Sequence, residues 1–569
     1  MTEKTTKFES FVRVVICLFA IFLTGVLTLA SIFSTTGMEI VQEGEGINNI
    51  VVTIQQGIET VWYYHDNIFA NLIWLVIGFA VCFSVMPFLK KVSFRTEIIF
   101  VSLWVIVLGS IWVMSSQVCP SEDSGTVATA SIRASRDDFE WLELPYFSYY
   151  SYQLGYVLFN EILIRIHDTF KEPANLIYLE IMNVIFLAVT YAGILTLSKR
   201  LFKDERIHHL TAFLLLFSIQ PIIFSVFLYG IYPGMMFAVW GIVFEVYYFQ
   251  TEKIRFIPLS AVCIALAYLI KPNYLICLTA MMIIVFAKAI SALKQPRKLV
   301  ICLAYFVLSI SLSFTMPKCV SSFYESRSGI QLQQSIPMTS FIAMGLNESG
   351  NAPGWYNYFH TISNFEIHNF NTQEASQASV EEIKNRLKYF SENKHYRDEF
   401  FYKKFVSQWN ETSYQSIWNN KVRMQYQEKG KFSEWVCNDG EQKTKAYMDI
   451  YAQLIFAGVL LGSIACLRKK ELMQIIFPLV IIGGMMYHLM AESKSQYAMP
   501  YYILMTGFTA VGICWLYDKI MPFLEPKLLA LQSKFKSEKR SNHERTEQSD
   551  QTQQVSEPDS PAQSADSGN

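Results

Sequence analysis

Long runs of apolar residues recur along the whole chain, and they restrict its fold more than any other feature. Runs of about 18 or more apolar residues let a helix cross a hydrocarbon core roughly 30 Å thick, and we count about twelve of them. They cover residues 11–33, 67–89, 96–115, 176–197, 209–229, 231–250, 256–270, 273–292, 299–317, 449–467, 471–490 and 500–520.

Composition supports a membrane class. Of the 569 residues, 52% are hydrophobic and only 17% are charged, which argues against a water-soluble globular protein. We therefore predict an all-α polytopic membrane protein with about twelve transmembrane helices. The first run is too long for a signal peptide and is expected to remain as an anchor. The net charge of −1 says nothing about a partner, because the charges are divided between the two sides of the membrane; no nucleic-acid partner is expected.

Basic residues set the expected orientation, since they favour the cytoplasmic side of a membrane. With twelve spans, every basic cluster falls on one side, so both termini are predicted to be cytoplasmic in the cell membrane. The clusters are Lys4, Lys7 and Arg13; Lys90, Lys91 and Arg95; Lys199, Arg200, Lys203 and Arg206; Lys253 and Arg255; Lys294, Arg297 and Lys298; and Arg468, Lys469 and Lys470.

The spans divide the chain into four regions. Residues 1–317 hold spans one to nine and an acidic outer loop at 116–152. Residues 318–447 are polar and are expected to form an extracytoplasmic α or mixed domain. Residues 448–520 hold the last three spans. Residues 521–569 are predicted to be a disordered cytoplasmic tail, because residues 526–569 are rich in Ser, Gln, Glu, Asp and Lys with few large apolar residues.

Two outer segments have the pattern of helices that lie on the bilayer. From Ile47 to Trp62, apolar residues recur at helical spacing with polar residues between them. Residues 152–166 are the second segment, in which Glu161 and Arg165 are spaced for an i,i+4 ion pair.

Two adjacent acids, Glu122 and Asp123, follow the third span directly, and no Lys or Arg occurs between them and Arg133. A carboxylate at the outer surface can deprotonate an acceptor hydroxyl as a general base, with Asp123 preferred and Glu122 second. The alternative is that both acids only solvate a loop.

Further candidate substrate-binding residues lie on the predicted outer side. Lys271 stands at a turn between two spans. Its ammonium is expected either to contact the phosphate of a lipid substrate or to extend to the membrane surface by snorkelling. Lys494 lies beside Glu492 and Tyr497 in a polar loop, and Arg327 is a weaker cation candidate. Asp137 and Asp138 form a second acidic group, before an aromatic run that includes Tyr146 and continues to Gln153. No Cys or His spacing typical of a metal site is present, so no cofactor is predicted; a divalent metal stays open but has no support in the sequence.

Several segments in order resemble the GT-C superfamily of integral-membrane glycosyltransferases, especially the polyprenyl-phosphate-sugar-dependent enzymes of Gram-positive bacteria. They are PSEDSGTV, PYFSYYSYQLGYVLFNEILIRI, LIKPNYLI, IPMTSFIAMGLNESG, FFYKKFVSQWNETSY and ESKSQYAMPYY. The resemblance implies that a sugar on undecaprenyl phosphate or a similar lipid is transferred, with inversion, to a wall polysaccharide, teichoic acid or glycolipid. It also implies that Asp123 corresponds to the family's first-loop catalytic acid.

Two other classes stay open. A polysaccharide polymerase or ligase is also multi-spanning, but it is expected to rely on outer arginines and a histidine. A transporter is disfavoured because the spans lack mid-membrane charge pairs and the chain has no evident repeat or GxxxxGK[ST] motif.

Overall fold

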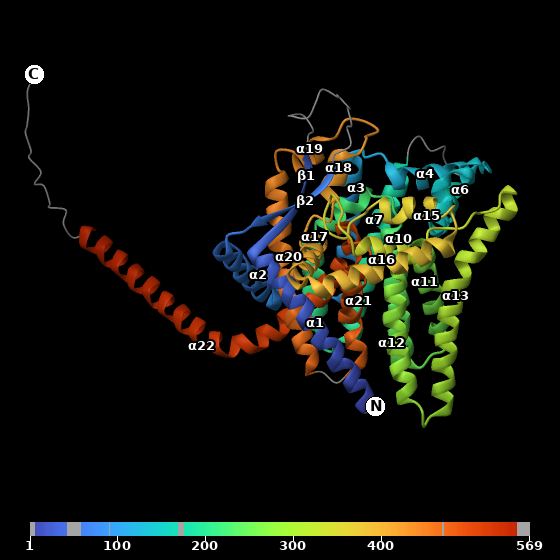
Figure 1. Cartoon of the computed structure of the whole chain (residues 1–569). Helices are drawn as coiled ribbons and strands as arrows, with labels where there is room; N and C mark the ends of the chain where they lie inside the picture. Colours follow the sequence, from blue (N-terminus) through green and yellow to red (C-terminus); the bar gives the residue numbers. More distant parts are fainter. Residues whose placement is uncertain (1–5, 42–57, 90, 169–175, 469–470, 555–569) are drawn as a thin grey trace, which may run out of the picture. The chain divides into compact units, whose positions relative to one another are not determined.

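The computed structural model describes residues 6–41, 58–89, 91–168, 176–468 and 471–554 (Figure 1). Within these ranges the regular structure is helical apart from one antiparallel pair of strands. The chain divides into two compact units, Met1–Cys514 and Trp515–Asn569. The first unit holds both strands and every helix up to the beginning of α22.

Ten helices within the described ranges are long and apolar enough to cross a membrane. They coincide with ten of the predicted runs and confirm the all-α membrane fold. These helices are α1 (Lys7–Phe33), α2 (Ile68–Leu89), α3 (Phe94–Ser116), α7 (Ile177–Leu201), α10 (Ile231–Thr251), α12 (Leu275–Ser291), α13 (Pro296–Ser328), α20 (Glu441–Leu467), α21 (Ile476–Met490) and α22 (Met499–Gln554). Short turns of 3-10 helix precede three of them: η4 (Pro272–Tyr274), η6 (Leu472–Ile475) and η7 (Ser495–Ala498).

The two remaining predicted runs form shorter pieces. Residues 209–229 fall on α8 (Glu205–Phe217) and on α9 (Gln220–Ile223) with η3 (Phe224–Val226), which bend by 48° at a short break. Pro221 lies in the first turn of α9, where its missing N–H costs nothing. Residues 256–270 form α11 (Phe256–Ile270), which packs against α10 and α13. Its 15 residues reach roughly 22 Å, less than a full hydrocarbon core.

The helices differ in how much apolar surface they bury. Most of α7, α10, α20 and α21 is buried in the bundle, whereas α2 and α13 expose most of their apolar side chains. In lipid, exposed apolar side chains are satisfied and each helix satisfies its own backbone hydrogen bonds. The sequence therefore specifies a packed central group of helices and a lipid-facing set.

The acidic segment between α3 and α7 is a folded helical layer. It comprises α4 (Glu122–Ser135), η1 (Glu140–Glu143), α5 (Pro145–Tyr149), η2 (Ser151–Gln153) and α6 (Leu154–Asp168). The helix predicted at 152–166 is confirmed as α6, and so is its Arg165–Glu161 ion pair, at 3.0 Å. Val127, Trp141 and Tyr156 share one buried cluster with Leu269 of α11 and Tyr324 of α13, so the layer packs onto these two helices.

Residues 318–447 begin inside a helix, because α13 continues past the predicted span end at 317 as far as Ser328. The rest of the region is helical or irregular, apart from an isolated bridge between Val118 and Gln425. Its elements are α14 (Met338–Gly345), the π-helical η5 (Phe359–Ser363), α15 (Asn364–Ile367), α16 (Thr372–Glu392), α17 (Lys394–Trp409), α18 (Ser416–Val422) and α19 (Lys431–Cys437).

The prediction of an amphipathic helix from Ile47 to Trp62 is wrong for the part of this segment that the structure describes. Residues Ile58–His65 form strand β2, which pairs antiparallel with β1 (Ser34–Val41), while residues 42–57 lie outside the described ranges. The sequence IETVWYYH is rich in β-branched and aromatic residues, which favour strands. Met38 and Val61 pack with Trp355 and Trp418, so the region 318–447 supplies the apolar surface that this hairpin needs.

The tail also differs from its prediction. Residues 521–554 continue α22 as a helix, and residues 555–569 lie outside the described ranges. After Pro526 the sequence is rich in Lys, Gln, Glu and Leu and contains no Gly or Pro before Gln554, so its local helix propensity is high.

Candidate active site

The acid pair lies in the first turn of α4. Gln117 ends α3 in the left-handed region, and Ser121 then precedes the turn that holds Glu122 and Asp123. The partial positive charge of a helix N-terminus favours carboxylates here. Glu122 has a positive φ of 53°, a conformation that is uncommon outside glycine and that clusters at functional sites. Both acids are exposed, so a ligand can reach them.

Tyrosine hydroxyls hold the Asp123 carboxylate. Its Oδ2 accepts a hydrogen bond from the Tyr229 hydroxyl at 2.9 Å. Tyr146 contacts Asp123 as well: burial raises the pKa of Tyr146, and the charge of Asp123 and a hydrogen bond to it add to the increase. Gln153 is buried and donates to the Tyr146 hydroxyl at 3.4 Å. The carboxylate therefore has a fixed orientation and an open approach.

Glu122 faces a different environment. It lines a cavity of about 430 Å³ on another side of α4, together with Thr126, Arg133 and Trp141. It makes none of the tyrosine contacts described for Asp123. Asp123 is thus the acid that faces the other candidate residues.

Lys271 ends α11 and lies against the same tyrosine. Its ammonium is 3.3 Å from the centroid of the Tyr229 ring and 5.6 Å from that of Tyr497. The residue is 5% exposed, so the ammonium faces aromatic rings inside the protein instead of snorkelling to its surface. Burial lowers the pKa of Lys271 to about 7, although the charges of Asp123 and Glu492 oppose this shift.

The loop between α21 and α22 approaches from the other side. The Tyr497 hydroxyl donates to Glu492 Oε2 at 3.3 Å, and the His488 ring stacks on Tyr497. Burial raises the pKa of Glu492 to about 7. The nearby Lys494 opposes the shift and Asp123 adds to it. The site therefore joins α4, the Tyr229 turn, the Lys271 turn and the 491–497 loop.

A buried lysine holds that loop in place. The ammonium of Lys404 on α17 donates to the backbone carbonyls of Gly345, Leu489 and Ala491. The backbone N–H of Ser493 also donates to the Gly354 carbonyl, at 2.9 Å. The region 318–447 thereby fixes the position of the loop that carries Glu492.

The segment after α18 holds the beginning of α4 in a similar way. Arg423 Nη1 donates to Ser124 Oγ at 2.6 Å, and its guanidinium lies 4.6 Å from the Phe227 ring centroid. Next to it, the Cys119 N–H donates to the Met424 carbonyl at 2.7 Å. Arg423 thus connects the region 318–447, the acid-bearing helix and the turn before Tyr229.

Three predicted site residues lie in a separate ion-pair network. Asp137 Oδ1 accepts from Arg165 at 2.8 Å and from Arg327 at 2.6 Å, while Asp138 pairs with Arg133 at 2.5 Å. Hydrogen bonds from Arg327 and Arg165 lower the pKa of Asp137. Asp137 follows α4, roughly 20 Å along the helix axis from Asp123. This network joins α4, α6 and α13 away from Lys271.

The candidate site residues predicted from the sequence do not include Tyr229, Lys404 or Arg423. A polar aromatic residue in an apolar run and two basic residues in a polar region have no distinctive signal. The one hint at Tyr229 is the following glycine: Gly230 has a φ of 76°, and a Cβ there would approach the Ile270 carbonyl to 3.1 Å. This close approach brings the Tyr229 turn against the turn that holds Lys271.

Comparison with known proteins gives a family and a distant structural likeness. No curated protein sequence matches the chain. The archaeal oligosaccharyltransferase AglB from Archaeoglobus fulgidus, solved with an inhibitory peptide and a dolichol-phosphate, is similar with a TM-score of 0.36 and 11% identity. The match covers 75% of this chain and 52% of AglB, so the chain spans about half the length of that enzyme. A family model described as "conserved hypothetical integral membrane protein" matches residues 8–511, and the chain belongs to this family.

Proposed function

We propose that this protein is a membrane glycosyltransferase that moves a sugar from a polyprenyl-phosphate donor to a cell-envelope acceptor. One observation carries the proposal: an exposed carboxylate and a buried ammonium contact the same tyrosine. Asp123 accepts a hydrogen bond from the hydroxyl of Tyr229, and the Lys271 ammonium lies over its ring. A base beside a cation is what a transfer from a lipid phosphate requires.

The reaction is a single displacement at the anomeric carbon of the sugar. The acceptor oxygen forms the new bond to this carbon while the bond from the carbon to the phosphate oxygen breaks, which inverts the configuration. Asp123 takes the proton of the acceptor hydroxyl. Lys271 stabilises the negative charge on the departing polyprenyl phosphate, which leaves with the electron pair of the broken bond.

Glu492 and Tyr497 fit the same scheme as substrate contacts. Their side chains lie beside the Lys271 ammonium, where hydrogen-bonding groups can meet sugar hydroxyls or the phosphate. Tyrosine rings near Asp123, including Tyr150 and Tyr152, provide flat apolar surface of the kind that stacks on sugar rings. Lys494 adds a second positive charge near Glu492.

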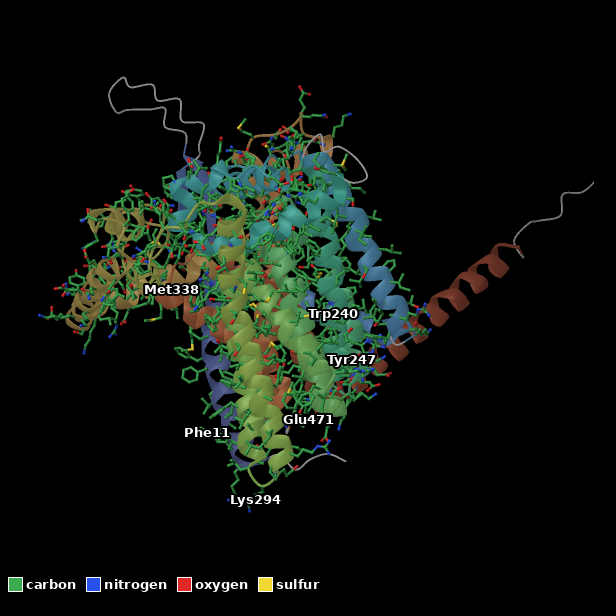
Figure 2. The ribbon with its side chains drawn as sticks, turned by 90° about the vertical axis from the view of Figure 1, so that its right-hand side faces the viewer. Phe11, Trp240, Tyr247, Lys294, Met338 and Glu471 are labelled. Carbon is green, nitrogen blue, oxygen red and sulfur yellow. The ribbon has the colours of Figure 1, made fainter. Side chains whose placement is uncertain are left out.

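The proposal places the reaction outside the cell membrane and both termini in the cytoplasm. Phe11, Lys294 and Glu471 lie toward one end of the bundle (Figure 2), near three of the predicted cytoplasmic basic clusters. The positive-inside rule assigns that end to the cytoplasm. The acceptor in this scheme is a wall polysaccharide, a teichoic acid or a glycolipid.

Replacing the base tests the proposal. Asp123→Asn keeps the size of the side chain but removes its basicity, so sugar transfer in membranes should fall by roughly 100-fold or more at normal protein levels. Asp398→Asn, the same change at an exposed residue of α17, is the matched control. Full transfer activity in Asp123→Asn would show that the base assignment is wrong.

Deletion of the gene tests the donor class. Cells that lack the transferase should accumulate a polyprenyl-phosphate sugar and lose one sugar from an envelope glycan. An unchanged set of lipid-linked sugars, together with unchanged envelope glycans, would contradict the proposed reaction.

A further inference from the structure

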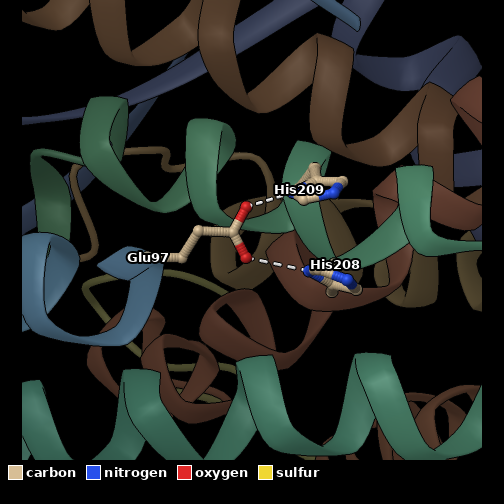
Figure 3. Close-up of side chains that lie close together, drawn as sticks. All are labelled: Glu97, His208 and His209. Atoms are coloured by element: carbon tan, nitrogen blue, oxygen red, sulfur yellow. Dashed lines mark hydrogen bonds and ion pairs between the residues drawn. The ribbon is translucent and has the colours of Figure 1, made fainter. Parts of the chain in front are cut away.

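Three buried side chains with metal-binding atoms meet at a second place in the molecule (Figure 3). Glu97 lies in the first turn of α3, and the consecutive residues His208 and His209 lie on α8. His208 Nδ1 is 2.8 Å from Glu97 Oε2, and His209 Nδ1 contacts Oε1 of the same carboxylate. The side chains of the three residues are at most 7% exposed.

The ligand atoms are close enough for one ion. One nitrogen from each imidazole and one carboxylate oxygen of Glu97 lie within 4.8 Å of one another. A Zn²⁺ ion binds such atoms at about 2.0–2.2 Å, which puts tetrahedral ligands roughly 3.3 Å apart. His208 therefore needs to withdraw from Glu97 by about half an ångström and the closer His209 by about one ångström, which small side-chain rotations can supply.

Charge also favours a cation. Within the described ranges, Glu97 pairs with the two histidines. With both imidazoles neutral, the group carries one negative charge in a buried setting, which is costly. The Phe94 ring packs edge-on against His208, with 5.2 Å between centroids, and shields one side from water. A divalent ion compensates the charge; protonation of one histidine is the competing explanation.

We propose that Glu97, His208 and His209 form a structural site for a divalent transition-metal ion of the Zn²⁺ class. Two imidazoles and one carboxylate suit this class, with water at the remaining position. On binding, each neutral imidazole carries its proton on Nε2, so that Nδ1 is free for the metal. The ion clamps the beginning of α3 to α8.

The site is separate from the proposed reaction. Glu97 lies about 28 Å along the α3 axis from Ser116, the end of the helix that leads to the acid pair. A role in the chemistry at Asp123 is therefore excluded by distance, and a structural role remains. The spacing of more than one hundred residues between Glu97 and the two histidines explains why no metal motif is visible in the sequence.

Metal content of the full-length protein tests the site. The protein is purified in detergent with an affinity tag that contains no histidine, loaded with Zn²⁺, freed of excess ion and measured by elemental mass spectrometry. We expect about one Zn²⁺ per chain, a melting temperature that rises with Zn²⁺ and falls again with EDTA, and visible d–d absorption after loading with Co²⁺.

Two variants assign the signal to these residues. His209→Gln keeps a side-chain amide that can hydrogen-bond to Glu97 but provides no imidazole ligand, and it should lose the Co²⁺ absorption and most of the bound Zn²⁺. His395→Ala, at an exposed residue of α17, should keep both. Wild-type protein with less than about 0.1 Zn²⁺ per chain and no thermal response would overturn the proposal, and would leave a carboxylate paired with a protonated histidine.

Discussion

Binding of a lipid phosphodiester by the Lys271 site should weaken as the pH rises from about 7 to about 9. In the empty site, burial lowers the pKa of Lys271 from 10.5 to about 7, against the opposing charges of Asp123 and Glu492. A bound anion favours the ammonium and raises this pKa again. Binding above pH 7 therefore takes up a proton, and each further pH unit costs about 1.4 kcal/mol, or about tenfold in affinity.

Glu492 adds to this dependence. Burial raises its pKa from 4.5 to about 7, so its carboxyl group gains a negative charge in the same pH range and then repels the phosphodiester. The phosphodiester itself keeps one negative charge throughout the range. Affinity should be nearly constant below pH 7 and should fall above it.

The assay is a fluorescence titration of the purified protein with a labelled polyprenyl phosphodiester, from about pH 6 to about pH 9 at constant ionic strength. Lys271→Arg keeps its charge at every pH, so it should retain affinity at high pH and show a shallower slope. Glu492→Gln should keep the slope that Lys271 causes. Constant affinity in the folded wild-type protein, or the same slope in Lys271→Arg, would refute the assignment of Lys271 to the phosphate.

Variants at three further residues test the contacts that hold the site together. Tyr229→Phe keeps the ring beneath Lys271 but removes the hydrogen bond to Asp123, so sugar transfer should slow roughly 10- to 100-fold. Tyr229→Leu also removes the ring, so it should weaken donor binding as well. Equal activity of Tyr229→Phe and the wild type would contradict this role of the hydroxyl. Lys404→Met leaves three buried carbonyls without their donor and should destabilise the protein by about 3 kcal/mol or more, seen as a lower melting temperature in detergent. Arg423→Lys loses the guanidinium contacts with α4 and should lower kcat while KM for the donor stays within about twofold; a change in KM alone would argue against a positioning role.

The fold was predictable where a single physical demand dominates the sequence. Lipid requires long, self-satisfied apolar helices, so the ten spans are visible as runs of Leu, Ile, Phe and Ala. Outside lipid this demand disappears. The stretch Ile58–His65 has apolar residues that fit a helix and a strand about equally well, and its pairing with Ser34–Val41 decided the outcome. That pairing depends on a distant surface around Trp355 and Trp418, which no local pattern encodes.

The candidate site was predictable only for charges that stand out against an apolar background. Asp123, Lys271 and Glu492 are conspicuous because they lie between spans, where charges are few. The structure brings them near one another. Asp137 and Arg327 are equally conspicuous, yet they pair with each other, because a sequence does not show which opposite charges will meet. Tyr229 connects Asp123 to Lys271 but looks like any aromatic residue beside a membrane span.

The charges around Lys271 also separate the roles of the two acids. Asp123, Glu492 and an incoming phosphodiester together carry up to three negative charges around one buried ammonium, an arrangement that repels the donor. Burial favours the neutral form of Glu492, whereas Asp123 is exposed and receives the Tyr229 hydrogen bond, which suits a carboxylate anion. A bound donor therefore stabilises a protonated Glu492 and a charged Lys271, and leaves Asp123 as the candidate for the base. Two carboxyl groups whose environments differ in this way divide into a base and a neutral hydrogen-bond donor.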